Sequence, residues 1–401
     1  MKKVLFILML FASLFVNAQV KGVIGEHWVG TWATAQQPIV KAYMPYNNNM
    51  SNRSVRQIVK VSIGGKLIRL QISNELSNEP LVIRSVYIAH AKDSSAVDAK
   101  TAKYLKFGNK YNITIPAGKT KFSDALVYDL KPLERLAITI NYTSAPVNPT
   151  VHMGSRTTSY IMRGVTNAGS SFNAAFRENH WFNIAAIDVY DMSCHSIAII
   201  GNSITDGKNS TDNLQNRWPD MMSEALQLKH KKTNLGILNL GIGNNRVVVP
   251  GGFGINAKDR FDHDILAQRG LCAVIIFEGV NDIGASSGNS ETVARQLIES
   301  YEAMIKKAQA GKLKVYLGTI SPFKGAGYYS PFHEAARETV NLWIRSQKER
   351  VDGILDFDEL LRDATDSQKL RKEYQSDWLH PNPEGYKVMG YYAAEIIAKT
   401  L

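Results

Sequence analysis

The chain has 401 residues, of which 44% are hydrophobic and 21% are charged, a balance that excludes an intrinsically disordered protein. This length exceeds what one hydrophobic core usually organises, so we expect two domains. The formal net charge of +11 comes from scattered basic residues rather than from a basic helix with interleaved aromatic residues, so no nucleic-acid partner is implied. A basic surface can attract acidic polysaccharides or anionic membranes, although a solvated basic surface is the simpler interpretation.

The first residues have the layout of a secretory signal peptide. Lys2 and Lys3 precede an apolar run over residues 4–16, and small residues then stand at a cleavage position, which predicts a signal peptide over residues 1–18. A transmembrane anchor is the alternative, but the run is shorter than the ~20 residues that a membrane span needs. We therefore expect an exported protein, periplasmic or secreted, without stable insertion in a membrane.

Residues 24–190 have the pattern of an all-β domain. Residues 55–63 alternate apolar and polar side chains, Gly64 and Gly65 interrupt the pattern, and the alternation resumes at Leu67, which predicts a β-hairpin with a glycine turn. Further strands are expected at 81–89, 111–115, 125–130 and 136–142. Short strands separated by turn signals predict a β-sandwich or jelly roll.

Residues 191–401 instead alternate apolar runs with amphipathic stretches. The expected strands are 196–200, 236–240, 273–277, 313–318 and 353–357, and the expected helices are 218–228, 291–310, 332–350 and 383–401. This order predicts a parallel sheet with helices on both faces.

Chemically suited residues follow the apolar runs, at the strand ends where sites form in open parallel sheets. After the first run, Ser203 stands in residues 201–207 (GNSITDG), where nearby glycines give a sharp turn room to present the hydroxyl; a purely structural turn is the alternative. After the second run, residues 239–246 (NLGIGNNR) have the glycines and asparagines of an anion-binding backbone nest, or of a flexible connection.

Two further segments complete the set. Asn281 follows the third run and offers a side-chain NH₂ group to a developing oxyanion, although an Asx turn is the alternative. Asp377 precedes His380 by three residues, a spacing that lets the carboxylate bind Nδ1–H and fix the imidazole tautomer for a serine nucleophile. A lone surface histidine is the ordinary alternative.

In this order, the four segments resemble the SGNH (GDSL-like) hydrolase superfamily, and in detail exported bacterial esterases with an N-terminal β domain. Similar stretches are residues 28–35, 216–220, 260–262 and 321–323. The resemblance implies a flavodoxin-like parallel sheet over residues 191–401, preceded by the β-sandwich or jelly-roll domain. It also implies Ser203 as nucleophile, His380 as general base and then acid, and Asp377 as the group that orients His380.

The resemblance implies an oxyanion hole formed by the N–H of Ser203, a backbone N–H of the second segment and the side chain of Asn281. Asn244 stands where the family has its oxyanion glycine, and asparagine is the non-glycine residue best suited to a left-handed backbone. We therefore expect Asn244 to donate, with Gly243 as the second assignment. Asn202 also departs from the family, which usually has aspartate before the serine.

Three functions remain open. The first is a serine carboxylester hydrolase that removes small acyl groups, with acetyl on a glycan as the favoured substrate. The second is a lipase or lysophospholipase of the same fold, for which residues 247–254 offer a possible flap, and the third is a non-catalytic glycan-binding protein. No cofactor or metal is expected, because the nine histidines show no pairing at ligand spacing and a Ser-His-Asp mechanism needs no metal. The oligomeric state is not predicted.

Cys194 and Cys272 are the two cysteines of the chain. Each lies nine positions before a proposed site residue, so neighbouring strands would bring the thiols to the same level and permit a disulfide. Two small buried apolar side chains are the simpler interpretation.

Overall fold

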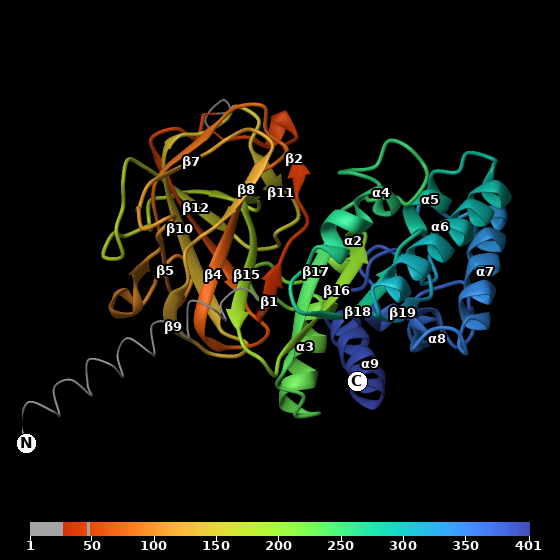
Figure 1. The fold of residues 1–401 in the computed structure, drawn as a ribbon. Coiled ribbons are helices and arrows are strands. Elements are labelled where there is room, and N and C mark those ends of the chain that lie inside the picture. Colours follow the sequence, from red (N-terminus) through yellow and green to blue (C-terminus); the bar gives the residue numbers. More distant parts are fainter. Residues whose placement is uncertain (1–26, 46–48) are drawn as a thin grey trace, which may run out of the picture.

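The computed structural model describes residues 27–45 and 49–401, so the expected signal peptide lies outside the described residues. Two parts adjoin each other: a β part of antiparallel strands and an α/β part, coloured red to yellow and green to blue in Figure 1. No helix within the described ranges is long and apolar enough to cross a membrane.

The β part is an antiparallel sandwich. Its strands are β1 (Trp28–Ala33), β2 (Gln37–Pro38), β3 (Arg53–Lys60), β4 (Gly65–Asn74), β5 (Leu81–His90), β6 (Lys103–Tyr104), β7 (Ile113–Ile115), β8 (Lys119–Phe122), β9 (Leu126–Leu130), β10 (Arg135–Ser144), β11 (Thr150–His152), β12 (Ser159–Arg163), β13 (Phe176–Glu178), β14 (Trp181–Phe182) and β15 (Ile184–Tyr190). One sheet has the order β1-β15-β4-β8 with β9 beside β4, a second has the order β13-β12-β3-β10-β5-β6 with β7 beside β5, and β14-β11-β2 form a small third. Apolar side chains of the two larger sheets, such as Val55, Ile72 and Ile138, share one buried core.

The predicted hairpin at Gly64 and Gly65 is wrong. Strand β3 pairs with β10 and β12, whereas β4 pairs with β15, β8 and β9, so the segment between them passes from one sheet to the other. Neither glycine has a positive φ. A side chain at Gly64 would instead overlap Leu130 O, and one at Gly65 would press on Val189. The glycines therefore permit close approach of neighbouring chain rather than a hairpin turn.

The α/β part has the expected parallel sheet. Its strands are β16 (His195–Gly201), β17 (Leu235–Gly241), β18 (Leu271–Phe277), β19 (Lys314–Gly318) and β20 (Gly353–Leu355), in the order β17-β16-β18-β19-β20. Its α-helices are α2 (Ser203–Asp206), α3 (Trp218–Leu228), α4 (Ala257–Phe261), α5 (Val280–Gly284), α6 (Ser290–Ala310), α7 (Pro331–Ser346), α8 (Phe357–Leu361) and α9 (Pro383–Thr400). Helices α3 and α9 pack together on one face and α6 and α7 on the other, as Figure 1 shows. This is the flavodoxin-like order, which confirms the fold class.

The two parts are joined by polar contacts as well as by packing. Gly30 N in β1 donates to Arg269 O at 3.0 Å. Ser62, in the β3–β4 connection, accepts from Ile237 N at 2.9 Å and from the Gln227 side chain at 3.0 Å. These contacts fix the β part beside β17 and α3, so its loops lie next to the strand ends of the parallel sheet.

Both cysteine thiols are free. Cys194 is buried in the core of the β part, and Cys272 donates to Ser196 O at 3.4 Å. Burial raises the pKa of each thiol to about 11. Both are therefore protonated at neutral pH and have little thiolate character.

Candidate active site

Ser203 is the first residue of α2, directly after β16. Asn202 caps this helix, since its side chain accepts a hydrogen bond from Ile204 N at 3.0 Å. The cap sets a sharp strand-to-helix turn. Ser203 is 8% exposed and lies at the carboxyl end of the sheet, where the sequence predicts it.

The structure brings Ser203, His380 and Asp377 into one hydrogen-bonded chain. Ser203 Oγ lies 2.8 Å from His380 Nε2, and His380 Nδ1 lies 2.9 Å from Asp377 Oδ2. Asp377 also accepts from His380 N at 2.8 Å and from Asn209 Nδ2 at 3.1 Å. Because a carboxylate can only accept, Nδ1 carries the proton and Nε2 is left to accept the hydroxyl proton of Ser203.

Burial and local charges set the protonation of this pair. Burial lowers the pKa of His380; Asp377 opposes this effect, whereas the positive charges of Lys208 and Arg156 add to it. Burial disfavours ionisation of Asp377, but hydrogen bonds from His380 outweigh it and lower the pKa of that carboxyl. At neutral pH the arrangement is therefore a neutral imidazole beside an ionised carboxylate.

The loop after β17 holds Asn244 in the left-handed region, with φ of 54°. Gly243 N donates to Asp206 Oδ2 at 3.0 Å and is thereby engaged. The N–H groups of Asn244 and Ser203 make no hydrogen bond to any residue within the described ranges. Of the two backbone donors considered for this loop, Asn244 has the available N–H.

Asn281 lies in the first turn of α5 and is 2% exposed. Its Oδ1 accepts from Tyr328 Oη at 3.1 Å, and its Nδ2 donates to Asn245 O at 2.9 Å. These two bonds fix the amide orientation and leave one N–H of Nδ2 without a bond to the described residues.

A backbone nest lies directly after the second segment, at residues 247–249, and it binds a carboxylate of the chain itself. Asp282 Oδ1 accepts the N–H groups of Val248 and Val249, each at 2.8 Å, and Asp282 Oδ2 accepts from Val247 N at 2.9 Å. The nest therefore anchors the loop that carries Asn244 rather than binding a ligand.

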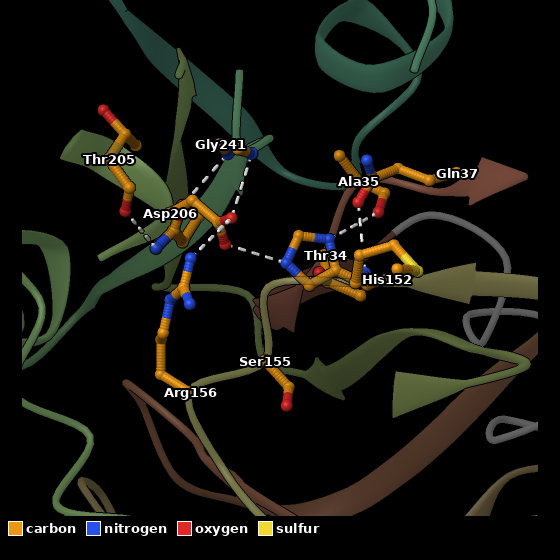
Figure 2. A network of polar contacts seen from close by, with 12 residues as sticks. Thr34, Ala35, Gln37, His152, Ser155, Arg156, Thr205, Asp206 and Gly241 are labelled. Carbon is orange, nitrogen blue, oxygen red and sulfur yellow. Dashed lines mark hydrogen bonds and ion pairs between the residues drawn. The ribbon is translucent and has the colours of Figure 1, made fainter. Parts of the chain in front are cut away.

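A second carboxylate, Asp206, anchors the same loop to the β part. Besides accepting from Gly243 N, it lies 2.9 Å from His152 Nε2, while His152 Nδ1 lies 2.9 Å from Ala35 O. Figure 2 shows His152 and Arg156 reaching Asp206 from different directions. His152 and Asp206 are each 2% exposed, so this contact between the two parts is enclosed.

An open cavity of about 440 Å³ lies in front of Ser203 and is shared by both parts of the molecule. The α/β part contributes Ser203, Asp206, Lys208, Gly243, Asn244, Phe253, Asn281, Tyr328, Leu379 and His380, and the β part contributes Gln37, Tyr43, Met153, Gly154, Arg156 and His180. No group of three or more His, Cys, Asp or Glu side chains in the described part of the chain is arranged to hold a metal ion.

Several of these residues were not predicted from the sequence. Tyr328 follows the fourth strand of the sheet, so the strand-end rule applied to residues 319–330 would have drawn attention to it. Asp206 lies within the segment already singled out for Ser203. His152 and Arg156 had no such signal, because nothing local marks a β-domain loop as a neighbour of Ser203.

Comparison with known families agrees with this geometry. Residues 199–388 match the model of the GDSL-like lipase/acylhydrolase family, a range that begins in β16 and ends in α9. Residues 199–388 therefore form a GDSL-like domain, and the β part lies outside the match. A comparison with curated proteins gave no match.

Solved structures similar to this chain cover about half of it. A lipolytic protein of the G-D-S-L family from Desulfitobacterium hafniense is 25% identical, with 50% of this chain and 98% of that chain covered and a TM-score of 0.39. An acetyl xylan esterase is 22% identical, with 50% and 99% covered and a TM-score of 0.41. A carbohydrate acetylesterase from Sinorhizobium meliloti is 14% identical, with 52% and 100% covered and a TM-score of 0.40.

Proposed function

We propose that this protein is a serine carboxylester hydrolase with Ser203 as nucleophile, His380 as general base and acid, and Asp377 as the residue that orients His380. The observation that carries the proposal is the continuous hydrogen-bonded chain from Ser203 Oγ through both ring nitrogens of His380 to Asp377. A chain of this kind lets the imidazole remove the hydroxyl proton while the carboxylate stabilises the imidazolium that forms.

In the first half of the reaction, Ser203 Oγ attacks the ester carbonyl and His380 Nε2 takes the hydroxyl proton. The tetrahedral intermediate collapses, the alcohol leaves with the proton from His380, and the acyl group stays on Ser203. In the second half, a water molecule gives a proton to His380 and attacks the acyl carbon. The carboxylic acid leaves and the proton returns to Ser203.

The proposed oxyanion hole has three donors: Ser203 N–H, Asn244 N–H and one N–H of Asn281 Nδ2. The two backbone groups have no bond to the described residues, and the Asn281 amide is fixed by Tyr328 and Asn245. Loss of one such donor typically costs about 3 kcal/mol, or roughly 10²-fold in rate.

We propose a small acyl group, acetyl on a glycan, as the substrate. The cavity is of the size that binds small molecules, and the exposed Tyr43 at its edge offers a surface on which a sugar ring can stack. The lipase alternative is favoured by a different observation: Phe253 and Ile255, in the loop after the nest, are 46% and 48% exposed. We also propose export to the periplasm or the exterior, based on the pattern of residues 1–18.

The test is hydrolysis of p-nitrophenyl acetate, butyrate and laurate by the mature protein and by Ser203→Ala. We expect Ser203→Ala to lose at least about 10³-fold in kcat. Ser367→Ala is the matched control, because Ser367 is exposed and outside the cavity, and it should retain activity. Wild-type activity that survives in Ser203→Ala would contradict the mechanism, and a preference for laurate would favour the lipase.

A further inference from the structure

Two cationic side chains line the cavity in front of Ser203. Arg156 comes from the loop between β11 and β12, and Lys208 follows α2 directly. Lys208 is exposed and forms no ion pair with any residue in the described ranges. Arg156 Nη2 lies 3.7 Å from Asp206 Oδ2, which is beyond hydrogen-bond distance.

Asp206 is shared, because it pairs with His152 at closer range than with Arg156. Both ring nitrogens of His152 face acceptors, Ala35 O and Asp206 Oδ1, each at 2.9 Å. Asp206 thus makes its shortest side-chain contact with His152, and its contact with Arg156 is the longer one.

The other carboxylate near the cavity is also engaged. Asp377 accepts from the ring and backbone of His380 and from Asn209. Both Arg156 and Lys208 lie close enough to lower the pKa of the His380 ring, so their field reaches the reacting groups. The cavity wall beside Ser203 is thus positively charged.

The backbone of Arg156 is fixed in place by its neighbours. Its φ is 49°, a left-handed conformation that is unfavourable for arginine. The turn is fixed because Ser155 Oγ donates to Thr157 O at 2.7 Å and Arg156 O accepts from Asn213 N at 2.9 Å. Arg156 Nε is buried without a hydrogen-bond partner in the described part of the chain. A strained backbone that presents a partly unpaired guanidinium to a cavity indicates a binding role.

We propose that Arg156 and Lys208 form an anion subsite, and that the natural substrate is an ester carrying an anionic oxygen group, a carboxylate or a phosphate, close to the bond that is cleaved. This inference rests on the proposed ester hydrolysis and adds the charge of the substrate to it. The guanidinium supplies paired N–H donors for two oxygens of one group, and Lys208 supplies a second point charge.

The test compares matched esters: 3-acetoxybenzoate, 3-acetoxyphenyl phosphate and the neutral 3-acetoxybenzamide. We expect wild-type kcat/KM to be at least about tenfold higher for an anionic ester than for the neutral one. That ratio should fall as the salt concentration rises, because exposed charges are screened. Whether the carboxylate or the phosphate gives the larger ratio identifies the preferred group.

The variants Arg156→Gln and Lys208→Gln should each lower the anionic-to-neutral ratio, whereas Arg156→Lys should retain most of it. Lys348→Gln is the control, since Lys348 is 74% exposed and outside the cavity, and it should leave the ratio unchanged. A wild-type ratio near one, or the same ratio in Arg156→Gln as in wild type, would overturn the proposal.

Failure of the ester hydrolysis itself is recognisable, because p-nitrophenyl acetate would then also remain intact. In that case calorimetric binding of benzoate and benzamide to the wild-type protein tests the subsite separately. Benzoate binding that is lost in Arg156→Gln supports the subsite, and equal or absent binding of the two compounds contradicts it.

Discussion

At the scale of single residues, the enclosure of His380 determines the pH at which the proposed reaction begins. Burial lowers the pKa of this imidazole. His380 therefore becomes neutral, and able to accept the Ser203 proton, at a pH below the usual histidine pKa of about 6.5. We therefore expect kcat/KM for a neutral ester to rise with a midpoint below about 6.5 and then to stay level through neutral pH. Initial rates at constant ionic strength provide the measurement.

The variant Lys208→Gln provides a second test of this pH dependence. Lys208 is one of the positive charges that disfavour the imidazolium form, so its removal should move the midpoint upward, towards the value for free histidine. A midpoint above about 6.5 in the wild type, or a downward shift in the variant, would show that a different group controls the profile.

Asn202 and Glu278 are hydrogen-bonded to each other beside the strand-to-helix turn that carries Ser203. Asn202 Nδ2 donates to Glu278 Oε2 at 3.1 Å, a bond that an aspartate at position 202 is unable to donate when ionised. Burial raises the pKa of Glu278 to about 8, and Arg260 only partly opposes this effect. The bond from Asn202 favours the ionised form of Glu278 and, like Arg260, only partly offsets the effect of burial.

The raised pKa of Glu278 predicts a pH-dependent loss of stability. Between its unfolded pKa of about 4.3 and its folded pKa of about 8, the folded state binds more protons than the unfolded state, so the free energy of unfolding falls as pH rises. Glu278→Gln cannot ionise and escapes this loss. The difference in Tm between variant and wild type should grow from pH 5 to pH 8 in thermal denaturation. A constant difference would mean that Glu278 does not ionise in this window.

At the scale of elements, the loop between β11 and β12 is expected to position the loop after β17, which carries the proposed oxyanion donor Asn244. Gly154 lies against Asp206, and an added Cβ would overlap Asp206 Oδ2, the atom that accepts from Gly243 N. Gly154→Ala should therefore displace Asp206 and the peptide next to Asn244, with a loss of roughly 10- to 10²-fold in kcat.

Gly169→Ala is the matched control for Gly154→Ala. Gly169 lies in the same part of the molecule, is exposed, and has only the flexible end of Asn167 near its Cβ position. Steady-state kinetics of p-nitrophenyl acetate hydrolysis, with circular dichroism to verify folding, provides the measurement. Equal kcat values for the two variants would show that the β11–β12 loop does not position the oxyanion hole.

The elements differ in how well the sequence predicts them. The apolar runs of β16 and β18 are buried on both faces of a parallel sheet, so each run coincides with a strand to within two residues. In the β part, the alternation at β3 predicts a strand but does not indicate which strand it pairs with. Local pattern thus located β3 and β4 but assigned them to the same sheet.

At the scale of the whole molecule, the cavity is formed by both parts. The strand-end rule located Ser203, Asn281 and the loop of Asn244, because each follows an apolar run directly, and the roles of these residues remain predictions. The same rule does not identify His152 or Arg156, because they lie near the site only through packing between the two parts. Sequence patterns encode the ends of elements, whereas contacts between separate sheets depend on three-dimensional packing that local pattern does not specify.

The shared carboxylate of Asp206 has a consequence for directed evolution of this protein. Asp206 contacts both the β11–β12 loop, which carries Arg156, and the peptide beside Asn244. A loop grafted between β11 and β12 to change substrate selectivity would therefore also change the rate of the proposed reaction. Transplanting the α/β part alone would leave Asp206 without His152. On the proposed mechanism, selectivity and turnover depend on the same loop, so libraries at this loop should keep His152 and Gly154 constant.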